Sequence, residues 1–260
     1  MSSAALFEFV AESRAAAGMT WSNASRVSLS RKYVCVSVPK VGCSTLKLAV
    51  HTLEAPANKI EWWQTHDDWP GWCALDHPDD VVVEMLSSPD WFRFCFVRNP
   101  YDRLVSAWKS KLATDDDRHY GWLRDGIRQA FDYPMLDGDQ PALIDFRDSF
   151  DYITTTDLVT LRDPHWMPQY ALLRPDVISY DVVGRFETFA SDFHSIFSRL
   201  DAPSNVLAMA QTRYNATFDT DLHNFYDADL AGRVYDVYAE DFRSFGYAPD
   251  SWRSPLGSSA

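Results

Sequence analysis

The feature that most constrains this fold is a short apolar run, a loop and an amphipathic helix, found twice along the chain. Residues 32–38 (KYVCVSV) are apolar and β-branched and stop at Pro39, and residues 45–53 carry apolar side chains at helical spacing. Residues 92–97 (FRFCFV) repeat the strand pattern, and a second helix is predicted through residues 102–112. Two such units in succession are typical of a parallel sheet with helices packed on it.

The remaining segments fit an α/β fold of three layers, with a central parallel sheet flanked by helices. Residues 177–183 (VISYDVV) form a third strand-like run. Further short helices are predicted at Pro78–Leu86, Gly121–Phe131, Ser191–Leu200 and Leu230–Phe242. No internal repeat or linker-like stretch interrupts the chain, so we expect a single domain over residues 1–260. Its core is expected at about residues 31–250, and the tail 251–260 is expected to be frayed.

Charge and composition exclude several classes of protein. The 260 residues contain 24 Lys and Arg against 37 Asp and Glu, which gives a formal net charge of −13. A chain this acidic repels phosphate backbones, so we expect no nucleic-acid partner. No stretch approaches the ~18 apolar residues of a membrane span, and the first residues lack the basic start of a signal peptide. These observations favour a cytoplasmic protein without a membrane span.

The cysteines carry no sign of a metal site. The chain has no CxxC pair and no other spacing typical of metal ligands, so no metal is expected. The cysteines are Cys35, Cys43, Cys73 and Cys95.

Residues 39–45 (PKVGCST) join the first predicted strand to the first predicted helix, and their residue types suit an anion. Gly42 allows a close approach of the backbone, and the helix start brings N–H groups and the positive end of the helix dipole. Lys40 adds a positive charge, and Ser44 and Thr45 add hydroxyl groups, with Ser44 also a favoured N-cap. The loop does not have the GxxxxGK[ST] sequence of a Walker-type P-loop. An ordinary strand-to-helix turn with a surface lysine is the alternative interpretation.

The second strand-to-helix unit adds a second set of groups suited to an anion. Arg98 follows the strand, where a guanidinium can form two hydrogen bonds with a phosphate. Ser106 lies in the middle of the predicted helix, whose start is favoured by Pro100 and Asp102. A surface arginine and a helical serine without a ligand are the alternative interpretation of this segment.

Five segments together resemble motifs of the sulfotransferases, most closely of carbohydrate sulfotransferases of the chondroitin and dermatan 4-O-sulfotransferase type. PKVGCSTLK (39–47) resembles their motif for the 5′-phosphosulfate group, and RNPYDRLVSAWKSK (98–111) resembles their motif for the 3′-phosphate. DPHWMPQ (163–169) is similar to an HW-x-PQ signature of that subgroup. YDVVGRFETFASDF (180–193) and YAEDFRSFGYAPD (238–250) resemble two further segments of it. The resemblance therefore spans most of the chain.

This resemblance implies a P-loop-like α/β fold and an enzyme that uses 3′-phosphoadenosine 5′-phosphosulfate (PAPS) without a metal. The enzyme would transfer the sulfuryl group of PAPS to a hydroxyl of a carbohydrate or glycosylated small molecule. Lys40 would stabilise the leaving 5′-phosphate, and Arg98 and Ser106 would hold the 3′-phosphate, with Arg213 as a further candidate for that role. The residues implied in binding the 5′-phosphate are Lys40, Val41, Gly42, Cys43, Ser44 and Thr45.

The acceptor hydroxyl needs a general base, for which the sequence offers three candidates. His66 and Glu61 lie between the two phosphate-binding motifs, the part of the chain in which several sulfotransferases have their base. An imidazole titrates near neutral pH, which favours His66 over Glu61. His165 is the alternative, either as the base or as a residue that positions the substrate. A structural role is the competing interpretation for each of them.

Two other functions stay open at this point. A P-loop-type ATP-dependent kinase would need a Walker-type loop and a Mg²⁺-binding acid on a strand, and the sequence shows neither. A non-catalytic nucleotide-binding module of the same fold is the second alternative, and the presence of Lys40, Arg98 and Ser106 argues against it.

Eukaryotic members of the family that the chain resembles carry an N-terminal membrane anchor. The resemblance therefore implies a soluble member of bacterial type, because no such segment is recognised here.

Overall fold

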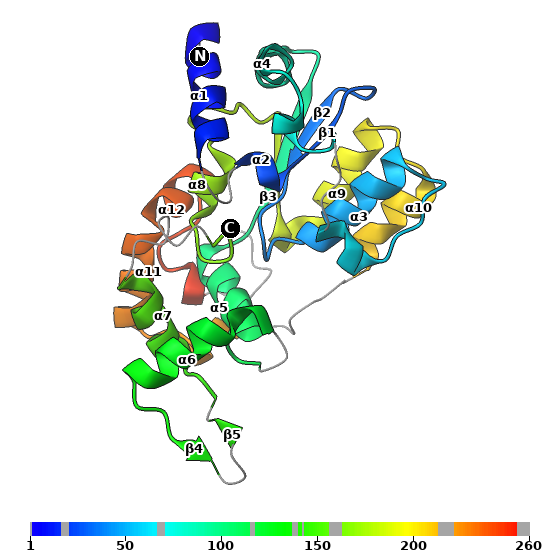
Figure 1. Cartoon of the computed structure of the whole chain (residues 1–260). Coiled ribbons are helices and arrows are strands. Elements are labelled where there is room, and N and C mark those ends of the chain that lie inside the picture. Colours follow the sequence, from blue (N-terminus) through cyan, green and yellow to red (C-terminus); the bar gives the residue numbers. More distant parts are fainter. Residues whose placement is uncertain are drawn as a thin grey trace. The chain divides into compact units, whose positions relative to one another are not determined.

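The computed structural model divides the chain into two compact units, which are described separately (Figure 1). Unit 1 comprises Met1–Arg98 and Gln169–Ala216, and unit 2 comprises Asn99–Pro168 and Thr217–Ala260. The structure describes residues 2–16, 21–66, 71–114, 118–136, 140–141, 143–155, 163–212 and 221–253. The single domain expected from the sequence stays a prediction.

Unit 1 is built on a sheet with the strand order β1-β2-β3-β6. The strands are β1 (Ser25–Ser28), β2 (Tyr33–Val36), β3 (Phe92–Val97) and β6 (Val182–Arg185). β2, β3 and β6 are parallel, which confirms the α/β class, whereas β1 is antiparallel to β2 and had not been predicted. The third predicted strand, 177–183, begins later than expected. The N–H groups of Val177 and Ile178 donate to the carbonyl of Arg174 at 2.9 and 2.8 Å and close a turn instead.

Helices cover both faces of this sheet (Figure 1). Figure 1 shows α3, α9 and α10 on one side of the sheet and α1, α4 and α8 on the other. All six residues of β3 are buried, as expected for a parallel strand that is covered on both faces. The helices of unit 1 are α1 (Ser3–Ala15), α2 (Trp21–Ala24), α3 (Cys43–Glu54), α4 (Asp79–Ser87), α8 (Gln169–Leu173), α9 (Phe189–Arg199) and α10 (Ser204–Leu207).

Unit 2 is mainly helical and has its own aromatic core. The ring of Tyr101 packs against Tyr226 and Phe242, and its hydroxyl donates to the carbonyl of Ala231 at 3.1 Å. A short antiparallel pair, β4 (Met135–Leu136) and β5 (Gln140–Pro141), lies between the helices α6 and α7 in the sequence. The helices of unit 2 are α5 (Pro100–Lys111), α6 (Gly121–Ala130), α7 (Phe146–Thr154), α11 (Ala228–Val237) and α12 (Ala239–Phe245).

The single helix predicted at Leu230–Phe242 is two helices. α11 ends at Val237 and α12 begins at Ala239, because Tyr238 leaves helical geometry with φ −106° and ψ 23°. The hydroxyl of Tyr238 donates to the carbonyl of Trp166 at 2.7 Å. This buried hydrogen bond ties the break between the helices to the segment around Trp166.

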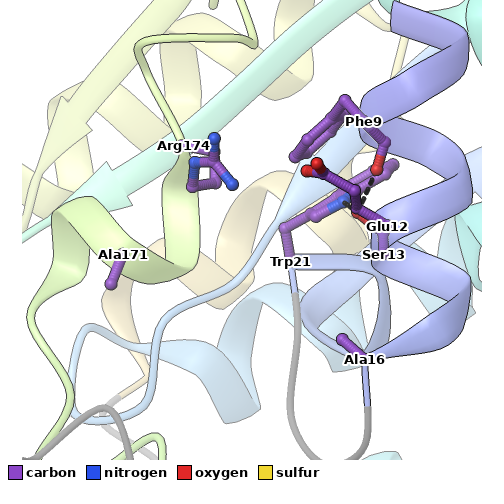
Figure 2. A pocket seen from close by; sticks show the side chains of 7 residues that line it. All are labelled: Phe9, Glu12, Ser13, Ala16, Trp21, Ala171 and Arg174. Carbon is purple, nitrogen blue, oxygen red and sulfur yellow. Dashed lines mark hydrogen bonds between the residues drawn. The ribbon is translucent and has the colours of Figure 1, made fainter.

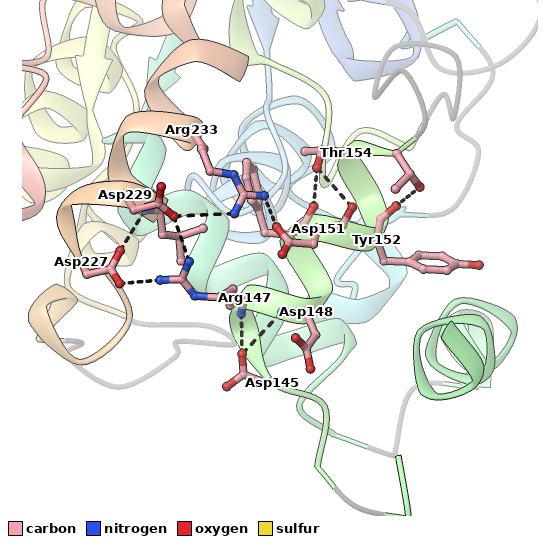
Figure 3. Close-up of polar contacts among 12 residues, drawn as sticks. Asp145, Arg147, Asp148, Asp151, Tyr152, Thr154, Asp227, Asp229 and Arg233 are labelled. Atoms are coloured by element: carbon pink, nitrogen blue, oxygen red, sulfur yellow. Dashed lines mark hydrogen bonds and ion pairs between the residues drawn. The ribbon is translucent and has the colours of Figure 1, made fainter. Parts of the chain in front are cut away.

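A network of ion pairs joins α7 to α11 within unit 2 (Figure 3). Arg147 of α7 donates to Asp227 at 2.6 Å and to Asp229 at 3.1 Å, and Arg233 of α11 pairs with Asp151 of α7. The pairs are exposed or half-buried, so water screens them and each contributes little to the stability of the fold. The network therefore orients the two helices more than it stabilises them.

The four cysteines are free thiols in two environments. Cys35 and Cys95 are buried in β2 and β3, and burial raises the pKa of Cys35 to about 12 and that of Cys95 well above its usual value. Cys43 and Cys73 are partly exposed.

Among the helices that the structure describes, none is both long enough and apolar enough to cross a bilayer.

Candidate functional site

The loop between β2 and α3 has an unusual backbone at two positions. Lys40 has φ 69° and Gly42 has φ 72°, both in the left-handed region. Gly42 is the N-cap of α3, so the helix begins at Cys43 and the cap is not Ser44, as capping preference had favoured. A left-handed residue is required here, and glycine adopts that conformation without steric cost. Lys40 carries a Cβ, so its left-handed conformation is strained and has to be held by its surroundings.

The start of α3 has the properties of an anion-binding helix terminus. The helix spans 12 residues, and the N–H of Leu46 donates to the carbonyl of Gly42 at 3.0 Å, which closes the first turn. Gly42 has no side-chain oxygen with which to cap the N–H groups of that turn. Ser44 and Thr45 lie in the same turn and are largely buried. Backbone N–H groups, hydroxyls and the helix dipole are therefore gathered where a phosphate or sulfate group would be stabilised.

Phe189, the first residue of α9, packs directly against the loop. A Cβ at position 42 would lie 2.7 Å from Cε2 of the Phe189 ring. The same ring lies 5.0 Å from that of Phe96 in β3, measured between centroids. The loop is therefore packed onto the end of the sheet by an aromatic side chain that only glycine at position 42 allows.

Arg98 follows β3 directly, as predicted, and the structure brings it to Lys40. Its Nη1 donates to the carbonyl oxygen of Lys40 at 2.8 Å, and its guanidinium carbon lies 4.1 Å from the centroid of the Phe186 ring. Its backbone pairs with the side-chain amide of Gln169. Arg98 is 7% exposed. A strained loop lysine and an arginine at the end of the next strand thus form one cluster, although 58 residues separate them.

Unit 2 carries Ser106 on α5, the helix predicted for it. Asn99 caps this helix, because its Oδ1 accepts from the N–H of Tyr101 at 3.0 Å. Arg103, one helical turn before Ser106, is buried and donates to the carbonyls of Met167 and Pro164 at 2.8 and 2.6 Å. α5 is therefore fixed to the DPHWMP segment.

His165 belongs to a hydrogen-bonded cluster in unit 2. Its Nδ1 lies 2.9 Å from Oδ1 of Asp163 and 2.8 Å from the hydroxyl of Tyr120. Burial by itself would raise the pKa of Asp163, but hydrogen bonds and charge interaction with His165, together with Tyr120, hold that pKa below its usual value. An ionised carboxylate at Nδ1 orients the imidazole, as is usual for a histidine that acts as a general base.

The remaining predicted residues are Glu61, His66, Arg213 and Val41, and the structure does not describe all of their side chains. Glu61 is exposed, and its N–H donates to Oε1 of Gln64 at 2.8 Å at the start of the turn Trp62–His66. This turn contains His66, but its side chain is outside what the structure describes. Arg213 also lies outside the described residues. Val41 is fully buried and shapes the loop from within.

Sequence reasoning missed several residues that hold these clusters together. Phe186 and Phe189 contact Arg98 and the loop, Gln169 pairs with the backbone of Arg98, and Asp163 orients His165. The DPHWMPQ segment had been singled out, so its aspartate and glutamine were within reach of the sequence. Phe186 and Phe189 lie in segment 180–193, which had also been singled out, but aromatic residues are more often core than site, so neither was predicted to contact the site.

A separate cavity of about 200 Å³ in unit 1 contains none of the predicted site residues (Figure 2). Arg174 at its edge lies 4.9 Å from the centroid of the Phe9 ring and pairs with Asp176 at 2.9 Å. The ion pair offsets the positive charge of Arg174, so this cavity suits an anion less well than the loop does. The lining residues are Phe9, Glu12, Ser13, Ala16, Trp21, Ala171 and Arg174.

Comparison with known proteins agrees with the resemblance found in the sequence. Carbohydrate sulfotransferase 14 of Mus musculus is 27% identical over 235 residues, which cover 85% of this chain and 59% of that protein. Carbohydrate sulfotransferase 11 of Rattus norvegicus is 30% identical over 235 residues, which cover 81% of this chain and 63% of that protein. Carbohydrate sulfotransferase 8 of Mus musculus is 26% identical over 227 residues, which cover 81% of this chain and 53% of that protein.

This chain thus spans less than two thirds of the length of each of these relatives. No solved structure matches it. The profile of the Sulfotransferase family, however, matches residues 25–248, which include all four strands of the sheet in unit 1 and α5 of unit 2. Because this match covers most of its length, the chain belongs to the sulfotransferase family.

Proposed function

We propose that this protein transfers a sulfuryl group from PAPS to a hydroxyl of a carbohydrate acceptor. Family membership supports the reaction, and the names of the relatives, all carbohydrate sulfotransferases, support the acceptor class. The observation that carries the proposal is the cluster at the end of the sheet. There a helix terminus, a strained lysine and a buried arginine gather positive potential in a chain whose net charge is −13.

The loop and Arg98 have distinct roles in this proposal. The first turn of α3 binds the 5′-phosphate of the donor through its N–H groups and the Ser44 and Thr45 hydroxyls. The Lys40 ammonium neutralises the charge that builds on the oxygen between phosphorus and sulfur as the S–O bond breaks. Arg98 binds the 3′-phosphate, which distinguishes PAPS from ATP.

The acceptor side of the reaction requires one proton to leave. As the acceptor oxygen bonds to sulfur, its proton passes to a general base and 3′,5′-adenosine diphosphate departs with the electron pair of the broken bond. We assign the base to His165, because Asp163 fixes its Nδ1 and its Nε2 is then the nitrogen that takes the proton. This assignment departs from the sequence hypothesis, which favoured His66.

Calorimetric titration without added metal tests the donor. We expect 3′,5′-adenosine diphosphate to bind at least about tenfold more tightly than ADP or ATP, a difference of about 1.4 kcal/mol. Arg98→Ala is expected to weaken the binding of the 3′-phosphorylated nucleotide by about tenfold or more. Equal or tighter binding of ATP would overturn the proposal and favour a kinase. Absence of binding by all three nucleotides would instead indicate a chain without nucleotide function.

The pH dependence of kcat/KM tests the base. Activity is expected to rise with pH as His165 loses its proton. In Asp163→Asn the imidazolium loses its carboxylate partner, so the rising limb moves to lower pH while kcat falls by about tenfold or more. His66→Asn and Glu61→Gln are the matched variants and are expected to leave the limb in place. The assignment to His165 would be wrong if the rising part of the pH profile stayed in place in Asp163→Asn and changed in His66→Asn or Glu61→Gln. The residue whose substitution changes the profile would then be the base.

A further inference from the structure

We infer that Gln169 is a positioning residue for donor binding: its side-chain amide fixes Arg98, and Arg98 in turn fixes the Lys40 loop. The inference rests on the proposed function, because it takes the 3′-phosphate as the ligand of Arg98. It assigns a role to Gln169, the last residue of the DPHWMPQ segment.

The first step is the pairing of Gln169 with the backbone of Arg98. The N–H of Arg98 donates to Oε1 of Gln169 at 2.9 Å, and Nε2 of Gln169 donates to the carbonyl of Arg98 at 2.8 Å. Gln169 is completely buried. One primary amide therefore satisfies both backbone groups of a single residue, as a neighbouring strand would.

The pairing lies where the sheet itself ends. β2 pairs with β3 as far as Val36 and Cys95, and β6 pairs with β3 as far as Arg185 and Val97. Arg98 is one residue beyond the last paired position. Buried backbone groups need hydrogen-bond partners, and at this position the amide of Gln169 supplies both.

The second step leads from Arg98 to the loop. With its backbone held, Arg98 places its guanidinium over the ring of Phe186 and donates to the carbonyl of Lys40 at 2.8 Å. That carbonyl belongs to the residue with φ 69°. A hydrogen bond to it helps to hold a conformation that a residue with a Cβ adopts reluctantly. A shift of Arg98 would therefore disturb the 3′-phosphate contact and the phosphosulfate loop together.

The side chain at position 169 has to be glutamine for this arrangement. Asparagine is one methylene shorter and cannot reach both backbone groups from the same Cα. Glutamate keeps the acceptor but loses the donor, and it places a carboxylate beside the arginine that has to bind an anion. Methionine has a similar length and volume and makes neither hydrogen bond, so Gln169→Met removes the pairing with the least change in packing.

The test is the affinity ratio of 3′,5′-adenosine diphosphate to adenosine 5′-monophosphate, measured by calorimetry on the full chain. The ratio isolates the contribution of the 3′-phosphate. Gln169→Met is expected to lower it by about tenfold, or 1.4 kcal/mol, whereas in an Arg98→Ala background the same substitution is expected to change it by less than about twofold. A merely structural role would lower stability without this dependence on Arg98.

Asp181→Ala is the matched control, since Asp181 serves the opposite end of the same strand. Its Oδ2 accepts from the N–H of Arg93 at 2.8 Å, and its own N–H donates to the Arg93 carbonyl at 2.7 Å. This variant is expected to unfold more easily and to keep the wild-type ratio. If Gln169→Met does not fold, Phe186→Leu, which removes the ring beneath the guanidinium, is expected to lower the ratio instead.

The outcomes separate this inference from the function on which it rests. A wild-type chain that does not prefer the 3′-phosphorylated nucleotide overturns the proposed function, and the inference falls with it. If the wild-type chain has that preference, the inference alone is tested by the variants. It is wrong if a folded Gln169→Met variant, or Phe186→Leu where Gln169→Met does not fold, keeps the wild-type affinity ratio. The inference is also overturned if the effect of Gln169→Met is equally large in the Arg98→Ala background.

Discussion

Replacing Lys40 with alanine is expected to lower kcat by about 10²–10³-fold, the usual cost of removing one group that stabilises charge in a transition state. Binding of 3′,5′-adenosine diphosphate is expected to change only a few-fold, because the first turn of α3 and Arg98 remain. Both lysine and alanine carry a Cβ, so the left-handed strain at this position is unchanged. Steady-state kinetics with PAPS and calorimetry with the product nucleotide measure the two effects separately.

Lys32→Ala is the matched control for this prediction. Lys32 also has a left-handed backbone, with φ 51°, but it precedes β2, is exposed and pairs with Asp90 at 3.5 Å. We expect wild-type turnover from this variant. A fall in nucleotide affinity as large as the fall in kcat in Lys40→Ala would show that Lys40 binds the donor without favouring the transition state, and the catalytic role given to it would be wrong.

Gly42→Ala is expected to destabilise unit 1 and to disturb the loop before α3. A residue with a Cβ pays about 1–2 kcal/mol for the left-handed backbone, and the new methyl would lie 2.7 Å from the Phe189 ring. Overpacking of this kind costs about 1–3 kcal/mol. We therefore expect the free energy of unfolding, measured in urea, to fall by about 2–5 kcal/mol, with loss of nucleotide binding as the loop shifts.

Gly71→Ala separates the two causes. Gly71 has φ 80°, and a Cβ there would meet no atom within 4 Å, so this variant carries the backbone strain without the clash. It is expected to lose about 1–2 kcal/mol and to keep nucleotide binding. Adding Phe189→Leu to Gly42→Ala is expected to relieve part of the clash and restore some affinity. Equal losses of stability in Gly42→Ala and Gly71→Ala would contradict the packing of Phe189 against the loop.

The elements with strong hydrophobic patterns could be predicted from the sequence, and those that depend on tertiary pairing could not. β3 occupies residues 92–97 as predicted. Its sequence FRFCFV has five apolar residues and one arginine, a pattern that is typical of a buried strand. β1 has the sequence SRVS, which carries no such pattern. Its burial comes from pairing with β2 and from the hydrogen bond that Val27 donates to the carbonyl of Trp72, and both are non-local.

The same distinction applies to the candidate site. Lys40 and Arg98 could be named because each follows a recognisable strand, and parallel pairing brings the carboxyl ends of neighbouring strands to one edge of a sheet. The hydrogen bond from Arg98 to the Lys40 carbonyl, the Phe186 ring beside the Arg98 guanidinium and the packing of Phe189 against Gly42 required the structure. Gln169 lies in a segment that the sequence singles out, but its pairing with the backbone of Arg98 could not be predicted, because glutamine is usually exposed and here it is fully buried.

The division of the cysteines into two environments provides an internal chemical reporter of site occupancy. Alkylating reagents attack thiolates, so the high pKa values of Cys35 and Cys95 keep these buried residues silent near neutral pH. Cys43 is partly exposed and is the first residue of α3, directly after the Gly42 cap, whereas Cys73 lies outside the loop. The rate of iodoacetamide labelling at Cys43 relative to Cys73, read from peptide masses, therefore gives a footprint of the bound nucleotide on the unmodified chain.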